Sequence, residues 1–198
     1  GEEASLIAVK ELQPAMMNHM EEESDRAIRE ANYKICQLIR QNNGVRSGST
    51  VAVLYLSQER ARACNVGDSR IYFCREDKFI HLSKDHNQAQ SLVDMGIIPL
   101  EDARHSKERH VLTQHLGIFP DEMEICPHYS DELRLQDGDV FLLCSDGLTE
   151  DVEDEVIQKA LSDKEKTPEH IRDELVEHAM AAGGKDNITI IVARVHIK

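Results

Sequence analysis

The stretch Val140-Phe141-Leu142-Leu143-Cys144-Ser145-Asp146-Gly147 decides the fold class. Five apolar residues in a row are typical of a strand buried on both faces, and a turn-forming Ser-Asp-Gly follows them directly. Asp146 is therefore expected at the rim of a buried sheet. Near the other end of the chain, Asp186 lies directly before the apolar run over residues 188–195, which places it at the rim of a second strand.

Around these strands the chain alternates between blocks of helical and strand-like periodicity. The predicted elements are helices over residues 2–18 and from a cap at Ser24 to Asn42, strands over 51–56, 60–66, 71–74 and 79–82, a pairing of strands 124–129 and 139–144, helices capped by Thr149 and Thr167, and a last, largely buried strand over 188–195. Such segregation favours an α+β fold with helices packed on antiparallel sheets. No linker or repeat divides the chain, which predicts a single domain over residues 1–198.

Residues 86–117 differ from the sequence around them. They are polar, hold four of the ten histidines, and contain one short apolar cluster that Gly96 ends. We predict that this segment is an insertion lying over the domain and not part of its core.

The composition excludes several classes of protein. The 198 residues are 40% hydrophobic, enough for a substantial core, and 23 Lys and Arg against 37 Asp and Glu give a net charge of −14. Binding to nucleic acid or to an anionic membrane needs basic surface, so neither is expected as a partner.

The cysteines and the N-terminal residues point to a location inside the cell. The five cysteines are odd in number and never spaced as Cys-x-x-Cys, which favours reduced, buried thiols. No apolar run approaches the ~20 residues that span a bilayer, and the first residues lack the basic start of a signal peptide. We predict a cytoplasmic protein.

Three aspartates could carry chemistry because each lies where an apolar strand meets a turn: Asp85, Asp146 and Asp186. Carboxylates that converge repel one another unless a divalent cation neutralises them, and a site of oxygen ligands suits Mg²⁺ or Mn²⁺ better than zinc. The alternative is structural, since aspartate is common in turns and can satisfy local backbone donors.

Other motifs give weaker signals. The glycine-rich residues 44–50 lack the lysine of a phosphate-binding loop and precede a strand. His105, His110 and His115 recur every five residues, which does not place them on one helical face for zinc. No nucleophile elbow is present, so covalent catalysis is not expected.

Five motifs together resemble the metal-dependent protein phosphatase 2C family, and most of all its bacterial serine/threonine branch. In chain order they are Gly48-Ser49-Thr50, Val66-Gly67-Asp68-Ser69-Arg70, Lys84-Asp85-His86, Leu142-Leu143-Cys144-Ser145-Asp146-Gly147-Leu148 and Gly184-Lys185-Asp186-Asn187-Ile188-Thr189. Their order and spacing cover nearly the whole chain.

The resemblance implies a fold, a metal centre and a reaction. The fold is an antiparallel β-sandwich with helices on both outer faces. Asp146 and Asp186 match ligands of a binuclear Mn²⁺ or Mg²⁺ centre, and Asp85 matches a ligand that holds a third ion together with Asp146. Such a centre acidifies a water that attacks phosphoserine or phosphothreonine proteins without a phosphoenzyme. Residues 86–117 match the family's flap beside the active site, and Asp68-Ser69-Arg70 is expected to be chiefly structural.

The resemblance also implies a part that the sequence does not show. In the family, an Asp-Gly-x-Gly-Gly segment, an acidic pair, a phosphate-binding arginine and two central strands precede the matched motifs. An N-terminally incomplete phosphatase domain is expected, with sheet edges that invite self-association. Two other readings are open: a catalytically inactive regulatory or binding module, and a structural domain in which the three aspartates do not converge.

Overall fold

The computed structural model describes residues 1–15 and 22–197. Its contacts divide the chain into two units, which are described separately. The first unit comprises residues 1–51, 65–68 and 85–128, and the second comprises residues 52–64, 69–84 and 129–198. The units are interleaved along the chain, so no single cut in the sequence separates them.

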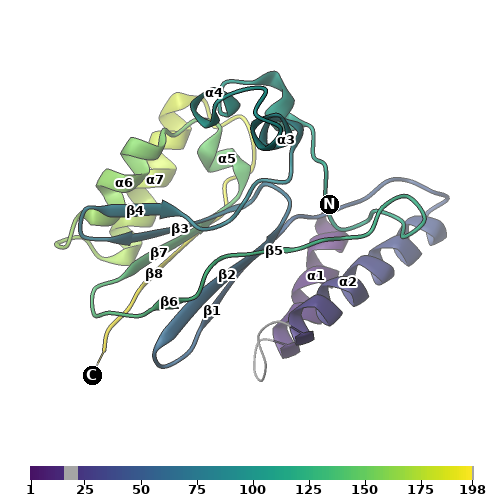
Figure 1. The fold of residues 1–198 in the computed structure, drawn as a ribbon, viewed down its shortest axis with the longest axis horizontal. Helices are drawn as coiled ribbons and strands as arrows, with labels where there is room; N and C mark the ends of the chain where they lie inside the picture. The colour runs from purple at the N-terminus through teal and green to yellow at the C-terminus, as the bar shows by residue number, and fades with distance from the viewer. Residues whose placement is uncertain (16–21, 198) are drawn as a thin grey trace. The chain divides into compact units, whose positions relative to one another are not determined.

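The second unit is built on two four-stranded sheets (Figure 1). In the first sheet the order is β1-β2-β5, with β6 also paired to β2; in the second it is β4-β3-β7-β8. The strands are β1 (Val51–Leu56), β2 (Arg60–Val66), β3 (Arg70–Arg75), β4 (Lys78–His81), β5 (His128–Tyr129), β6 (Leu133–Arg134), β7 (Val140–Cys144) and β8 (Ile190–Arg194). The pairs β2–β6, β3–β4, β3–β7 and β7–β8 are antiparallel, as predicted.

Side chains on the two faces of the β4-β3-β7-β8 sheet enter two different cores. Phe73 and Phe141, with ring centroids 5.1 Å apart, join Ala61 and Ala63 of β2 in the core between the sheets. The alternate residues, such as Leu142, pack on the other face against α5 (Asp146–Thr149), α6 (Asp154–Ser162) and α7 (Pro168–Ala182). This alternation confirms the α+β prediction of an antiparallel sandwich, and helices α5, α6 and α7 cover the outer face of the β4-β3-β7-β8 sheet (Figure 1).

The predicted pairing of residues 124–129 with 139–144 is wrong. Strand β7 pairs with β3 on one side and β8 on the other, so no free edge of β7 is left. Only residues 128–129 form a strand in the first segment, and they join β2. The last strand is also shorter and less buried than predicted, because β8 covers Ile190–Arg194 and Ile191 is 57% exposed.

Two helix starts also differ from prediction. The second helix, α2 (Glu22–Gln41), begins before Ser24, which is a buried residue within it and not its cap. Thr149 ends α5, and the next helix, α6, begins only at Asp154. Thr167 caps α7 as predicted, because its side chain accepts a hydrogen bond from the His170 N–H.

In the first unit, two helices pack together through small and branched side chains. Helix α1 (Glu2–Ala15) buries Ala4 and Ala8, and α2 buries Ile28 and Ile35. The end of the predicted helix 2–18 lies outside the described residues. The buried Asn32 of α2 joins this pair to the following loop, since its Oδ1 accepts from Gly117 N at 2.7 Å and its Nδ2 donates to Ile118 O at 2.9 Å.

Residues 86–117, predicted to be an insertion, contain three short helices: α3 (Gln88–Asp94), α4 (Leu100–Ala103) and the 3₁₀ helix η1 (Lys107–His110). At its base, Asn87 pairs with Leu112 in an isolated bridge, and the Asn87 side chain caps α3 by accepting from Gln90 N at 2.8 Å. The bridge and the cap close the segment on itself.

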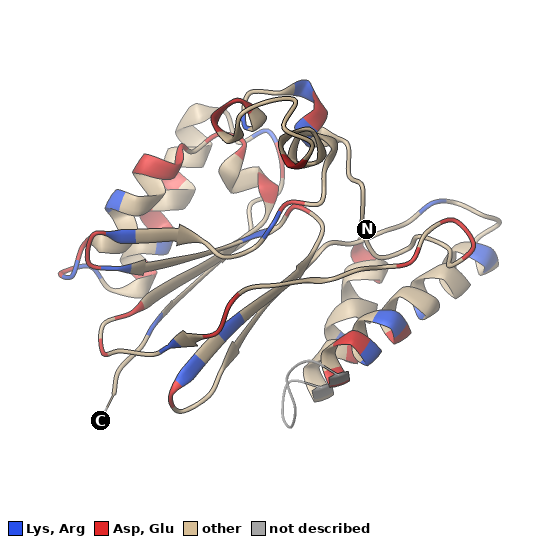
Figure 2. Ribbon diagram, viewed as in Figure 1, with Lys and Arg blue, Asp and Glu red and all other residues tan. Residues whose placement is uncertain are grey.

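Charged residues lie on helices, loops and several strands, while β7 carries none (Figure 2). Within residues 1–15 and 22–197, no helix has both the length and the apolar character to cross a membrane.

One buried ion pair links β3 to the turn before β7. Arg75 donates from Nε to Asp139 Oδ1 at 2.6 Å and from a terminal nitrogen to Oδ2 at 2.7 Å. Asp139 Oδ2 also accepts from Gln136 N at 2.8 Å. The Asp139 side chain is fully buried, and that of Arg75 is 26% exposed.

Replacing Asp139 with asparagine is expected to lower the free energy of unfolding by about 3 kcal/mol, because it leaves a largely buried guanidinium without its counter-charge. Urea denaturation measures the loss. Glu132→Gln is a matched control, since Glu132 pairs with Arg60 on the surface and should cost less than about 1 kcal/mol. Equal losses in the two variants would contradict this assignment.

Candidate metal centre

Asp146 begins the short helix α5 directly after β7. Its main-chain oxygen accepts from Glu150 N at 2.8 Å, which fixes the first turn. Gly147 follows because nothing larger fits: a Cβ there would lie 2.4 Å from the main-chain oxygen of Asn187 and 3.5 Å from the carbonyl carbon of Asp186. The chain next to Asp146 therefore touches the chain at Asp186.

Asp186 lies in the loop that joins α7 to β8. Helix α7 ends at two glycines with positive φ, Gly183 at 138° and Gly184 at 53°, which turn the chain back toward the sheet. The Asp186 carboxylate accepts from Asn187 N at 2.7 Å. Ser145 holds the far side of this loop, because its hydroxyl donates to Asn187 O at 3.1 Å and accepts from Thr189 N at 3.0 Å.

The carboxylates of this site act on one another. Burial raises the pKa of Asp146 above its usual value, and the negative charges of Glu150 and then Asp186 raise that pKa further. The structure therefore brings Asp146 and Asp186 together, as the positions of the strand ends predicted. Glu150 was not predicted from the sequence as part of this site. Its position four residues after Asp146, one helical turn away, is the pattern that would have indicated it.

A divalent cation fits this arrangement chemically. Carboxylate oxygens are the donors that Mg²⁺ and Mn²⁺ prefer, and a cation between Asp146 and Asp186 would offset the repulsion that raises the Asp146 pKa. Within residues 1–15 and 22–197, no group of three or more His, Cys, Asp or Glu side chains is arranged to hold a metal. The described chain thus supplies a pair of carboxylates and not a closed ligand cage.

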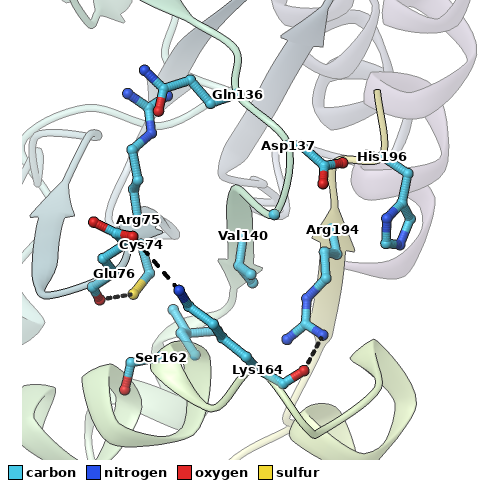
Figure 3. A pocket seen from close by; sticks show the side chains of 12 residues that line it. Cys74, Arg75, Glu76, Gln136, Asp137, Val140, Ser162, Lys164, Arg194 and His196 are labelled. Atoms are coloured by element: carbon cyan, nitrogen blue, oxygen red, sulfur yellow. Dashed lines mark hydrogen bonds and ion pairs between the residues drawn. The ribbon is translucent and has the colours of Figure 1, made fainter. Parts of the chain in front are cut away.

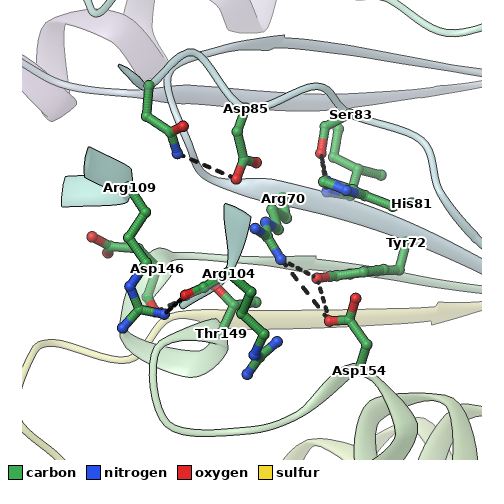
Figure 4. A network of polar contacts seen from close by, with 12 residues as sticks. Arg70, Tyr72, His81, Ser83, Asp85, Arg104, Arg109, Asp146, Thr149 and Asp154 are labelled. Atoms are coloured by element: carbon green, nitrogen blue, oxygen red, sulfur yellow. Dashed lines mark hydrogen bonds and ion pairs between the residues drawn. The ribbon is translucent and has the colours of Figure 1, made fainter. Parts of the chain in front are cut away.

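Asp85 lies in the first unit, so its predicted role as ligand of a third ion stays a prediction. The side chain is buried, and Asn87 Nδ2 donates to Asp85 Oδ2 at 3.4 Å (Figure 4). Next to it, the Nδ1 atom of His86 accepts from Gly67 N at 3.2 Å, while His86 N donates to Gly67 O at 3.0 Å. These contacts tie the Asp85 segment to the Gly-Asp-Ser-Arg turn.

Arg70 of that motif is the first residue of β3 and joins it to α6 through Tyr72. It donates to the Tyr72 hydroxyl at 3.0 Å, and this hydroxyl donates to Asp154 at 3.0 Å at the start of α6 (Figure 4). Burial raises the pKa of Tyr72, whose ring stacks on Phe79 and His81. A protonated, packed tyrosine of this kind anchors a helix to the sheet.

The second unit also contains a cavity of about 410 Å³ at the opposite end of β7 (Figure 3). It is lined by Val140, the first residue of that strand, and by the side chains of Arg75 and Arg194. Arg194 donates to the main-chain oxygens of Asp163 and Lys164 after α6. Since Asp146 lies just beyond Cys144, the last residue of β7, this cavity is separate from the carboxylate pair.

Comparison with known proteins agrees with the geometry. The family model described as "Stage II sporulation protein E (SpoIIE)" matches residues 3–196. The serine/threonine protein phosphatase PstP of Mycobacterium tuberculosis is 33% identical over 172 residues, which are 86% of this chain and 32% of PstP. The protein phosphatase PhpP of Streptococcus pneumoniae is 33% identical over 165 residues, 80% of this chain and 63% of PhpP.

A solved structure shows the same fold with metal bound. The crystal structure of the catalytic domain of PstP in complex with two manganese ions superposes with a TM-score of 0.82 at 29% identity, over 99% of this chain and 82% of that one. The chain spans 32% of the full length of PstP and 63% of that of PhpP. The match over residues 3–196 and the likeness to these phosphatases place the chain in the SpoIIE family, among the bacterial metal-dependent protein phosphatases of the 2C type.

Proposed function

We propose that this protein is a metal-dependent phosphatase that hydrolyses phosphoserine and phosphothreonine in proteins. The observation that carries the proposal is the juxtaposition of Asp146 and Asp186 at two adjoining strand ends, with a raised Asp146 pKa. PstP is a serine/threonine protein phosphatase and PhpP a protein phosphatase, and the catalytic domain of PstP binds two manganese ions, which supports the same activity here.

In this proposal Asp146 and Asp186 hold Mn²⁺ or Mg²⁺, and Asp85 contributes to a third, looser ion. A divalent cation bound there lowers the pKa of a coordinated water and offsets charge on the phosphoryl oxygens. The chain's own contribution is positional: Ser145 and Gly147 fix the distance between the two loops, and the buried end of β7 keeps Asp146 partly shielded from solvent.

We propose that residues 86–117 act as the flap that meets the phosphoprotein. We also propose a cytoplasmic location. The thiols support it, because Cys36, Cys64, Cys74 and Cys144 are buried and form no disulfide, and burial raises the pKa of Cys36 and Cys74. Buried, protonated thiols are suited to a reducing compartment.

Hydrolysis of an aryl phosphate with and without Mn²⁺ tests the activity directly. Asp146→Asn is expected to lower kcat/KM at least about a hundredfold, because it removes one of the two facing charges that hold the cation. Asp173→Asn is the control, since Asp173 is an exposed carboxylate on α7 paired only with its neighbour Arg172 among the described residues.

Three outcomes of that assay are informative. Metal-dependent turnover lost only in Asp146→Asn supports the proposal. Turnover that survives the substitution removes Asp146 from the centre. A complete lack of turnover in the wild type, with Mn²⁺ present, would favour an inactive regulatory module.

Asp146→Asn should have a higher melting temperature than the wild type without metal and a lower one with excess Mn²⁺. The pKa of Asp146 is higher in the folded protein than in the unfolded chain, so the unfolded chain loses this proton at a lower pH. The free energy of unfolding therefore falls as the pH rises from the unfolded pKa to the folded pKa. At pH 7 in EDTA, asparagine removes this repulsion and should raise the melting temperature by about 2 °C. In excess Mn²⁺ the order should reverse, because only the wild type gains stability from binding.

We also propose self-association through the outer edge of β8. This strand ends the β4-β3-β7-β8 sheet, and Ile191 is 57% exposed on it. An exposed apolar edge strand can pair with a second copy. Ile191→Lys is expected to shift the protein toward monomer in sedimentation velocity, whereas a wild type that is monomeric at high concentration would refute this contact.

A further inference from the structure

Lys185, the residue before Asp186, is held in place by its contacts. Its ammonium lies 2.9 Å from Asp151 Oδ1. Its aliphatic stem folds back over the turn, because Cε and Cγ lie 3.5 and 3.6 Å from the point where a Cβ on Gly183 would stand. The side chain therefore crosses from the loop that carries Asp186 to the segment that follows α5.

The two partners differ in exposure. The Asp151 side chain is 6% exposed and that of Lys185 is 70% exposed. An ion pair between two exposed groups contributes little, but removing the partner of a buried carboxylate is costly. The contact is thus stronger than an ordinary surface pair, and its loss would act mainly through Asp151.

This ion pair is the second link between the same two segments. Ser145, just before Asp146, binds the loop at Asn187 and Thr189, just after Asp186. Asp151, five residues after Asp146, binds the loop at Lys185, just before Asp186. Asp186 is consequently held on both sides by the segment that carries Asp146.

Two facing carboxylates push apart when no cation lies between them, and this loop can relieve the repulsion by moving away. The attraction between Lys185 and Asp151 opposes that movement. We propose that Lys185 is a positioning residue that holds Asp186 against Asp146 in the metal-free protein and thereby strengthens Mn²⁺ binding. The inference rests on the proposed function, in which these two aspartates bind the cation.

Whether removing the Lys185 charge weakens or tightens Mn²⁺ binding distinguishes a positioning role from direct repulsion of the cation. A lysine near a cation site repels the cation through space, so removing its charge alone should tighten Mn²⁺ binding. If the lysine instead positions Asp186, the same removal should weaken binding. The sign of one measurement therefore decides between the two roles.

The test uses isothermal titration of Mn²⁺ into the full chain. Lys185→Met, which keeps the stem and removes the charge, is expected to raise the Kd about tenfold, while Lys185→Arg, which can still reach Asp151, should stay within about twofold. Lys166→Met is the matched control, because Lys166 also forms a close ion pair, with Glu174 at 2.6 Å, away from this loop. Unchanged or tighter binding by Lys185→Met would overturn the proposal.

A second readout needs no metal. In EDTA, amide hydrogen exchange over residues 184–189 should be faster in Lys185→Met than in the wild type and unchanged in Lys185→Arg. Equal exchange in all three proteins would overturn the positioning role, whether or not the wild type binds Mn²⁺. Failure of the wild type to bind Mn²⁺ would refute the proposed function and not the positioning role.

Asp151→Asn completes a double-mutant cycle. It should weaken Mn²⁺ binding as Lys185→Met does, and the double variant should be no weaker than either single one if both act through the same contact. If Asp151→Asn does not fold, the two Lys185 variants still carry the test, because that side chain is mostly exposed.

Discussion

The close contact between Gly147 and the main-chain oxygen of Asn187 is the constraint on which the site depends. It leaves no room for a side chain, since a Cβ would lie 2.4 Å from that oxygen. Because Gly147 follows Asp146 and Asn187 follows Asp186, the contact fixes the approach of two loops that are about forty residues apart in sequence. The hydrogen bonds of Ser145 to Asn187 and Thr189 hold the same approach from the β7 side.

This contact is precise because it is built on a rigid support. Strand β7 is paired on both sides and buried on both faces, with Phe141 in the core between the sheets and Leu142 under the helices. A strand held in this way has little freedom to shift, so the backbone just beyond its end, at Asp146, is held in a fixed position. Asp146 thus lies in a short segment that starts from a paired and buried strand.

The sequence predicted the parts of this arrangement that depend on local pattern. The apolar run of β7 predicted Asp146 just beyond a strand end, and this position is confirmed. The apolar residues after Asp186 predicted it at the start of the last strand, whereas β8 begins only at Ile190. The sequence could not predict contacts made over long separations. It gave no sign that Asp151 pairs with Lys185, and it paired residues 124–129 with β7 when β8 takes that place. Which strands pair depends on which strand edge is free in the folded sheet, and the local periodicity of the sequence carries no information on that edge.

At this site, repulsion between carboxylates is opposed by contacts that hold the two segments together. Asp146, Asp186 and Glu150 carry like charges whose crowding raises the Asp146 pKa, so this part of the fold costs free energy when no cation is present. The opposing contributions come from neutral hydrogen bonds at Ser145 and from one buried carboxylate paired with a lysine. These attachments at Ser145 and Lys185 do not use the carboxylates of Asp146 and Asp186, which is why two repelling groups can be held close together without a cation.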